Sequence, residues 1–567
     1  MASVAAVDEA VNDQSPEPET SPDARRRDAA RRLAETGVDL LVVGGGITGA
    51  GIARDAALRG LSVAIVEKTD FGAGTSSRSS KLVHGGLRYL ENYQFGLVME
   101  STRERYRQRR LNPHLVWPIP FLMPVYEGSR HGMFKLNLGL WLYDLLAMFR
   151  SFRIHKKLRP DRATALAPGL RSEGLRGGLH YYDCRTDDAR LTLANVLDAE
   201  RHGAIALNYT RYVGPQRDSG GRVEGAALAD ELDGSRWDLR CRHIVYATGH
   251  WSDRTPGAPG GGKLIRPTKG VHVVVPRERL PIDAAVTLTA VRDGRVMFAI
   301  PFENTTYIGT TDTDYDGDLD DIRASSDDVA YILETTNHYF PDAALTAADV
   351  RSTWAGLRPL IRDDSDSAYK TSREHEIFPE PSGITTIAGG KLTTYRAMAD
   401  EVMRHVVRDL AKRHGVKARR CRTHKVPLDP GVSTPEDLLN GPADPFERNL
   451  WRQHGSAASW VRERMASHPA EAAILTPDLP VVLAQVSWAV LGEHGLHVED
   501  VLLRRLPVFY RAADQGLGCA RLVASHMAAL LGRDERWVDR EVRAWEGLVQ
   551  ASREWRESAP AALAETA

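Results

Sequence analysis

Three glycines near the amino terminus have the spacing of a turn that holds a dinucleotide phosphate. Gly44, Gly46 and Gly49 follow the pattern G-x-G-x-x-G. In such a turn the first glycine permits the tight bend, the second lets the backbone approach a pyrophosphate, and the third lets the next helix pack closely on the preceding strand. The N–H groups at the start of that helix then point toward the phosphates. The spacing therefore predicts a phosphate-binding turn.

The segments around these glycines predict the βαβ unit that such a turn requires. Val38–Val43 is a short apolar run typical of a buried parallel strand. A helix is expected from about Gly49 to Leu58, followed by a strand over Leu61–Val66 that ends at Glu67. An acid about 20 residues past the turn holds a ribose hydroxyl. This unit fits NAD or the adenosine of FAD, and an ordinary βαβ unit with a glycine-rich turn is the alternative.

A second segment, residues 75–90, has the sequence T-S-S-R-S-S-K-L-V-H-G-G-L-R-Y-L. Its small hydroxyl side chains can donate hydrogen bonds to phosphate or ring oxygens and accept them from N–H groups, and their size admits a cofactor. Taken alone, a T-S-S run is also typical of a capped turn.

Composition narrows the class of protein. The chain has 567 residues, enough for two to four domains, and a formal net charge of −1, which does not indicate a nucleic-acid partner. The four cysteines show no C-x-x-C spacing, so neither a metal site nor a disulfide framework is expected; they are Cys184, Cys241, Cys421 and Cys519. Unpaired cysteines favour a reducing compartment.

Two segments indicate where in the cell the protein is expected: the amino-terminal segment and one apolar segment. Residues 1–36 lack the apolar stretch of a secretory signal and contain several acids, so a disordered tail is expected. No run of eighteen or more apolar residues predicts a membrane-spanning helix. Met133–Phe149 is apolar, is interrupted by Asp144 and other polar residues, and has basic flanks. It fits an interfacial helix with Leu140, Trp141 and Leu145 in the lipid, or equally a core-facing helix.

Six longer motifs resemble the FAD-dependent glycerol-3-phosphate dehydrogenases. These are the segment 75–90, DCRTDDARL (183–191), KGVHVVVP (269–276), IGTTDT (308–313), WAGLRPL (354–360) and GGKLTTYR (389–396). The resemblance covers about residues 37 to 400, and 498–505 resembles the helical cap of that family. It implies an α/β fold with α+β elements: a glutathione-reductase-like Rossmann domain for FAD, an antiparallel-sheet substrate domain and a helical carboxy-terminal cap.

The resemblance also implies a division of the chain. We expect a discontinuous FAD-binding domain over 37–125, 180–270 and 350–415. A substrate-binding domain over 126–179 and 271–349 would contain the inserted amphipathic segment. The helical cap would occupy 425–567.

By the same resemblance, FAD would contact residues from four parts of the chain. A reduced flavin carries negative charge near N1 and O2, which a helix amino terminus after the last glycine pair would stabilise. The expected cofactor-binding residues are Gly44, Gly46, Gly49, Glu67, Thr75, Ser76, Ser77, Lys81, Leu82, Gly249, Gly389, Gly390, Lys391 and Leu392.

The substrate implied by the resemblance is glycerol 3-phosphate, whose dianionic head suits arginine. The expected substrate-binding residues are Arg88, Tyr89, Arg358, Arg373 and Lys391. A neutral histidine suits the base that takes the C2 hydroxyl proton. His84 is slightly favoured over His272, both could be structural, and proton transfer assisted by Arg358 is a third route.

The expected reaction is oxidation of sn-glycerol 3-phosphate to dihydroxyacetone phosphate, with a hydride passing to FAD and electrons to a membrane quinone. The alternatives are an oxidase that uses oxygen and a flavin-binding module without catalysis. A quinone acceptor implies a cytoplasmic protein held peripherally on the inner-leaflet lipid surface of the cell membrane. A homodimer is a further expected assembly.

Overall fold

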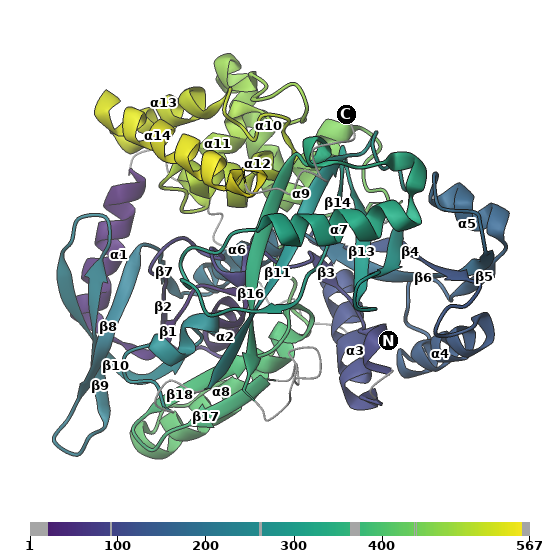
Figure 1. The fold of residues 1–567 in the computed structure, drawn as a ribbon. Coiled ribbons are helices and arrows are strands. Elements are labelled where there is room, and N and C mark those ends of the chain that lie inside the picture. Colours follow the sequence, from purple (N-terminus) through teal and green to yellow (C-terminus); the bar gives the residue numbers. More distant parts are fainter. Residues whose placement is uncertain are drawn as a thin grey trace, which may run out of the picture.

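The computed structural model describes residues 21–90, 93–259, 264–362, 375–435, 437 and 439–557. Two large sheets form its centre, and a group of helices formed by the carboxy-terminal part of the chain packs against the second of them (Figure 1).

The first sheet carries the glycine turn. Its strands are parallel to one another except for an antiparallel strand at one edge, β17, and the β8–β9 hairpin beside β10. In order across the sheet the strands are β17 (His375–Pro379), β18 (Ile384–Gly389), β10 (Arg236–Tyr246), β1 (Val38–Val43), β2 (Val63–Val66) and β7 (Ile205–Leu207), with β8 (Thr210–Arg217) and β9 (Val223–Asp230) extending β10.

The strand β1 is apolar and buried from Leu40 to Val43 because both faces of this sheet are covered. Side chains alternate between the faces along a strand. Leu40 and Val42 face a core shared with the helices α2 (Ile47–Leu58), α6 (Asp188–Arg201) and α8 (Tyr395–His414). Leu41 and Val43 face a second core that includes α1 (Pro22–Thr36) and the β8–β9 arm.

The second sheet is mostly antiparallel. It runs in the order β15 (Thr313–Asp314), β11 (Ile265–Pro276), β14 (Thr305–Gly309), β13 (Val296–Phe302), β12 (Ala285–Thr289), β4 (Val116–Tyr126), β6 (Leu175–Thr186) and β3 (Leu82–Val83), with β16 (Ser352–Ile361) beside β11 and β5 (Lys156–Leu158) beside β6. The helices around it are α3 (Phe95–Leu111), α4 (Met133–Leu146), α5 (Pro160–Leu166) and α7 (Ser326–Tyr339).

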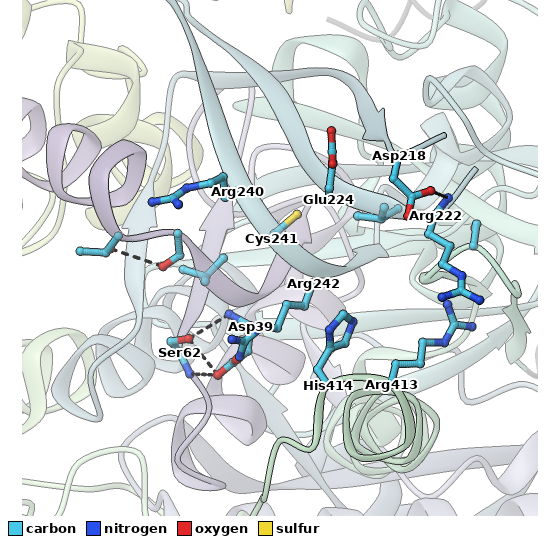
Figure 2. A pocket seen from close by; sticks show the side chains of 15 residues that line it. Asp39, Ser62, Asp218, Arg222, Glu224, Arg240, Cys241, Arg242, Arg413 and His414 are labelled. Atoms are coloured by element: carbon cyan, nitrogen blue, oxygen red, sulfur yellow. Dashed lines mark hydrogen bonds and ion pairs between the residues drawn. The ribbon is translucent and has the colours of Figure 1, made fainter. Parts of the chain in front are cut away.

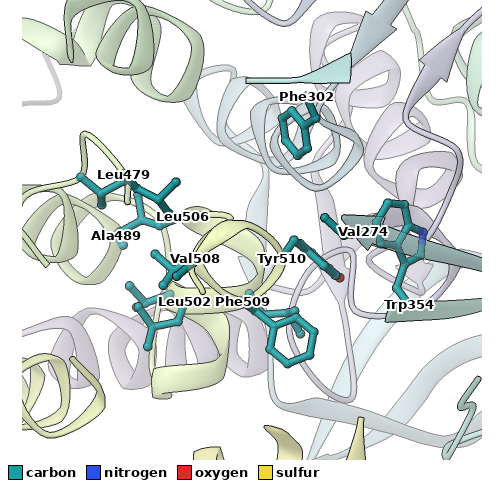
Figure 3. Packing of buried hydrophobic residues seen from close by; sticks show 14 of the residues in the cluster. Val274, Phe302, Trp354, Leu479, Ala489, Leu502, Leu506, Val508, Phe509 and Tyr510 are labelled. Atoms are coloured by element: carbon teal, nitrogen blue, oxygen red, sulfur yellow. The ribbon is translucent and has the colours of Figure 1, made fainter. Parts of the chain in front are cut away.

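The cap is helical, as predicted. Its helices are α9 (Pro445–His454), α10 (Ala458–Ser467), α11 (Leu483–Gly492), the π-helical turn η9 (Asp500–Arg505), α12 (Val508–Arg511), α13 (Ala520–Leu531) and α14 (Glu535–Ala551). In Figure 3, Tyr510 of α12 points from the cap toward Trp354 of β16. Their ring centroids are 5.2 Å apart, and both belong to one large apolar core. The cap is therefore packed onto the second sheet as one body.

Two sequence predictions about elements are wrong. Pro22–Thr36, expected in a disordered tail, is the helix α1, whose Leu33 is fully buried and whose Arg26 forms an ion pair with Asp230. The sequence boundaries also placed most of β4, β6 and β16 in the FAD domain, whereas all three belong to the second sheet. Apolar runs identify strands but carry no information about which sheet a strand joins.

The helix α4 has two different faces. Leu140 and Tyr143 are buried, and Asp144 is buried with its carboxylate 2.7 Å from His155 Nδ1. The prediction that Leu140 contacts lipid is therefore wrong. Phe134, Leu138, Trp141 and Leu145 are exposed on the other face. No helix among the described residues has the length and apolarity needed to cross a membrane.

Candidate functional site

The glycine turn has the geometry that its spacing predicts. Gly44 has φ +109°, and a Cβ there would lie 2.5 Å from Ala247 O; a Cβ at Gly49 would lie 1.9 Å from Gly44 O. Larger residues would therefore push the turn apart. The helix α2 begins at Ile47, earlier than predicted, so Gly49 lies in its first turn.

The start of α2 is open to an anion. Gly46 is its N-cap residue and supplies no side-chain hydrogen bond. A Cβ at Gly46 would meet only Ser76 Oγ, at 3.1 Å. Ile47 N donates to Ser76 Oγ, and the remaining N–H groups of the first turn, with the positive end of the helix dipole, attract phosphate. The residues present therefore fit the pyrophosphate of a dinucleotide.

Glu67 lies at the end of β2, beside the turn. Its carboxylate accepts hydrogen bonds from Gly45 N at 2.7 Å and from Thr69 N at 3.1 Å. Burial raises the pKa of Glu67, although these hydrogen bonds oppose the rise. The acid is thus fixed next to the glycine turn, where a ribose would lie.

The segment 75–81 joins the glycine turn to the second sheet. Ser76 Oγ accepts from Ile47 N at 2.9 Å, and Thr75 Oγ1 donates to Leu357 O of β16 at 2.6 Å. A Cβ at Gly356 would lie 2.8 Å from Arg78 O, so the segment rests directly on β16. A cofactor bound at the turn would extend along this segment toward the sheet.

Lys81, which is expected to line the cofactor, forms a buried ion pair. Its Nζ bonds to Asp188 Oδ1 at 2.5 Å and to Ser77 O at 3.2 Å, and the side chain is buried. Asp188 also accepts from Ser79 N and Oγ. The ion pair therefore holds the segment against α6. The next residue, Leu82, begins β3.

His84, Tyr89 and Lys391 gather at one end of this segment. Lys391 Nζ lies 3.9 Å from the Tyr89 ring centroid, and His84 N donates to Thr393 Oγ1 at 3.2 Å. His84 Nδ1 accepts from Gly86 N at 3.1 Å. A neutral His84 ring then carries its proton on Nε2, which donates but does not accept in this state.

His272 and Arg358 lie on the same face of the β11–β16 pair. In this register His272 opposes Trp354 and Thr268 opposes Arg358. The His272 ring stacks on Trp354 with centroids 4.7 Å apart, and its Nε2 is 2.9 Å from Ser80 Oγ. Its buried Nδ1 has no hydrogen-bond partner among the described residues. Burial, with Arg358 and Lys81 nearby, lowers the pKa of His272 well below its usual value, which keeps the ring neutral.

The Arg358 guanidinium is held by groups of the β14–β15 region. Nη1 lies 3.0 Å from Asp312 Oδ1, and Nη2 donates to Thr310 Oγ1 and Thr311 O, both at 3.1 Å. A Cβ at Gly270 would lie 2.5 Å from Nη2, so this glycine provides the space for the guanidinium. The orientation of the fork is thus set before any substrate binds.

The other expected cofactor residues lie at strand ends of the first sheet. Gly389 and Gly390 have φ of +74° and +98°, and a Cβ at Gly390 would lie 2.1 Å from Met398 Cε. The short helix η6 (Leu392–Thr394) follows Lys391 and continues into α8 without a side-chain cap. Gly249 begins η3 (Gly249–Arg254) after β10.

Two predicted arginines cannot be placed in the site. Arg88 lies in η2 (Leu87–Leu90), but its side chain is outside the described part of the structure, and Arg373 lies outside the described residues. Sequence reasoning missed Asp188 and Asp312, which hold Lys81 and Arg358. Both acids lie within the motifs DCRTDDARL and IGTTDT, but their partners are distant in sequence.

Two other polar features lie apart from this arrangement. A groove of about 490 Å³ lies where β1 and β2 begin, lined by Asp39, Arg242 and His414 among others (Figure 2). This is the opposite end of the strands from the glycine turn. In the second feature Asp55, Asp400 and Cys421 lie together, but Arg59 donates to both carboxylates, as in an ion-pair network.

Comparison with known proteins identifies relatives that bind or use FAD, in agreement with a dinucleotide site at the glycine turn. Residues 39–396 match the family model described as FAD dependent oxidoreductase, and 386–537 match the C-terminal domain of alpha-glycerophosphate oxidase. A protein of Staphylococcus haemolyticus (strain JCSC1435) named aerobic glycerol-3-phosphate dehydrogenase is 41% identical over 403 residues, covering 71% of this chain and 72% of that protein. Its namesake from Staphylococcus saprophyticus is 35% identical over 527 residues, covering 90% and 93%.

A solved structure agrees with these matches. The glycerol-3-phosphate dehydrogenase from Bacillus halodurans, complexed with FAD, has a TM-score of 0.75 and 31% identity, covering 94% of this chain and 98% of that one. The predicted fold class and cofactor are thereby confirmed. The chain belongs to the FAD-dependent glycerol-3-phosphate dehydrogenase family, and its cofactor is FAD.

Proposed function

We propose that this protein oxidises sn-glycerol 3-phosphate to dihydroxyacetone phosphate and passes the electrons to a membrane quinone. The observation that carries the proposal is the placement of Arg358 and His272 on one sheet face, directly beside the segment that extends from the glycine turn. When bound there, FAD supplies the acceptor for the C2 hydride. The names of the relatives support the same substrate.

The chain's own residues would bind and orient the phosphate. Arg358 presents planar N–H donors that match phosphate oxygens, and Lys391 adds a second cation beside Tyr89. Arg88 and Arg373 would complete the set. A dianion recognised in this way explains why unphosphorylated glycerol would be a poor substrate.

The C2 hydroxyl proton requires a base. We favour His272, because its ring is neutral and its Nδ1 is uncommitted within the described residues. His84 is the second candidate, and it would first have to give up the bond from Gly86 N. In this assignment Arg358 orients substrate and raises the acidity of the hydroxyl by its charge.

The exposed face of α4 supports a quinone acceptor. Phe134, Leu138, Trp141 and Leu145 recur at helical spacing and are exposed. Exposed basic residues lie near both ends of the helix: Arg130, Lys135, Arg150, Arg153, Lys156 and Lys157. An apolar face with basic neighbours is the pattern of a helix lying in the surface of an anionic bilayer. This would place the protein peripherally on the cytoplasmic membrane face, where quinone is available.

A steady-state assay tests substrate and acceptor together. The purified holoenzyme is given glycerol 3-phosphate with a quinone analogue, or with oxygen alone while peroxide is measured. Fast quinone reduction with slow peroxide formation is expected. Fast oxygen use would identify an oxidase, and no turnover with either acceptor would contradict the proposed substrate.

A binding assay tests the membrane role. Changing Phe134, Leu138, Trp141 and Leu145 to serine should release the protein from anionic liposomes and lower activity with membrane quinone, while activity with a soluble dye persists. The control changes exposed apolar residues elsewhere, namely Val291, Ile474 and Leu522. Equal binding of both variants would contradict attachment through α4.

A further inference from the structure

The loop after β2 is built onto the glycine turn. Glu67 accepts from Gly45 N, and Gly72 N donates back to Gly45 O at 3.0 Å. A Cβ at Gly45 would lie 2.6 Å from the Phe71 ring and 2.8 Å from Glu67 Cβ. The position of residues 67–73 therefore determines where Glu67 lies and the shape of the turn.

Asp70, in the middle of this loop, is fully buried. Its carboxylate accepts from Arg504 Nε at 2.6 Å, from both Nη groups of Arg505 and from Asn208 Nδ2. Burial alone would raise the pKa of Asp70, but the charges of Arg505 and Arg504 outweigh it and lower the pKa to about 2. The carboxylate is thus held in place by two cations.

Both arginines belong to η9 of the cap, where other contacts fix them. Arg505 also donates to Glu493 O, and Arg504 donates to Asp500 Oδ1 at 2.7 Å. His494, from the same part of the cap, contacts the Phe71 ring edge-on with centroids 5.6 Å apart. The cap therefore contacts the loop at two adjacent residues, Asp70 and Phe71.

We propose that Arg504 and Arg505 are positioning residues for the adenosine end of FAD. Through Asp70 they hold residues 67–73 so that Glu67 meets the ribose and the turn meets the pyrophosphate. The cap thereby determines how tightly the cofactor is retained. This inference rests on FAD binding and does not depend on the electron acceptor.

The test measures FAD release from full-length holoenzyme by the fluorescence of freed flavin. Arg505→Gln is expected to weaken FAD binding at least tenfold. Asp70→Asn removes this ion pair and also that of Arg504, and it should weaken binding at least as much. The double variant should lose no more than Asp70→Asn alone, because that single change already breaks the Arg505 contact.

The matched control is Arg190→Gln. Arg190 of α6 makes a buried two-pronged ion pair with Glu493 of the cap, at 2.6 and 2.7 Å, and within the described structure no hydrogen bond or ion pair joins its side chain to residues 67–73. Loss of the Arg190–Glu493 ion pair should lower the melting temperature as Arg505→Gln does. The FAD affinity of Arg190→Gln should stay within about twofold of wild type.

Two outcomes would overturn the proposal. One is unchanged FAD affinity in Arg505→Gln together with a melting temperature lowered as in the control, which would mean that the contact only holds domains together. If Arg505→Gln does not fold, Arg505→Lys decides, since it keeps the charge and loses the two-pronged geometry. Normal FAD affinity in that variant would also overturn the proposal.

Discussion

In the proposed function Arg358 has two partners, the substrate phosphate and Asp312, and a pair of variants can separate the two roles. Arg358→Met keeps much of the side-chain volume and removes the charge. A hydrogen bond to a charged group contributes about 1.5–3 kcal/mol. Loss of the charged hydrogen bonds to phosphate should therefore cost about 3–5 kcal/mol, which lowers kcat/KM by roughly 10²–10⁴.

The same change affects stability through Asp312. The Asp312 side chain is 7% exposed and loses its ion pair with Arg358. Because 21% of the Arg358 side chain is exposed, water already weakens that pair. We therefore expect a loss of about 2 kcal/mol in the free energy of unfolding, less than for a fully buried pair.

The double variant Arg358→Met/Asp312→Asn removes both charges. It should recover the free energy of unfolding to within about 1 kcal/mol of wild type, because no carboxylate is then left with its ion pair broken. Its kcat/KM should stay low. Steady-state kinetics with a soluble dye and urea denaturation measure the two quantities. Recovery of kcat/KM in the double variant would refute a phosphate-binding role for Arg358.

Three further predictions concern acid stability, cofactor binding and the base. Burial lowers the pKa of His114 and His250 to about 4 and that of His454 to about 3. Below about pH 6.5 the unfolded chain binds protons that the folded chain does not. The free energy of unfolding should therefore fall between about pH 6.5 and 4, by about 1.4 kcal/mol per pH unit for each histidine; denaturation curves showing no such fall would contradict this. Gly46→Ala should fold normally yet bind FAD at least tenfold more weakly in a flavin fluorescence titration. The control Gly139→Ala, whose added Cβ has no atom within 4 Å, should bind FAD with wild-type affinity. His272→Gln should lower kcat by about 10²–10⁴, as expected for loss of a base, and a larger loss in His84→Gln would transfer that role to His84.

Local patterns predicted the parts of the site that are local. The turn at Gly44–Gly49 and the acid Glu67 follow from one βαβ unit, whose geometry is set by neighbouring residues. The motifs that contain His272 and Arg358 were recognised by their resemblance to the family, and each lies within a single strand. Where a role depends on spacing within one element, the sequence contains the necessary information.

Roles that depend on distant partners were not predictable. Lys81 is neutralised by Asp188, and nothing in the sequence pairs those two residues. The helix α1 is highly charged, which favours disorder in isolation, but contacts with Asp230 and with Arg533 of the cap hold it. Both sides of α4 contain leucine and aromatic residues, so only packing shows that Leu140 is buried and Trp141 is exposed.

The strand order of the first sheet has a consequence for biosynthesis. The glycine turn is made within the first 50 residues, but β10 and β18, which complete the sheet beside it, end at residues 246 and 389. At roughly 5–20 residues per second, ribosomes need on the order of tens of seconds to add the intervening chain. During that time the newly made turn lacks the strands β10 and β18. We therefore expect FAD to bind only after β18 has been synthesised, when more than half of the chain has been made.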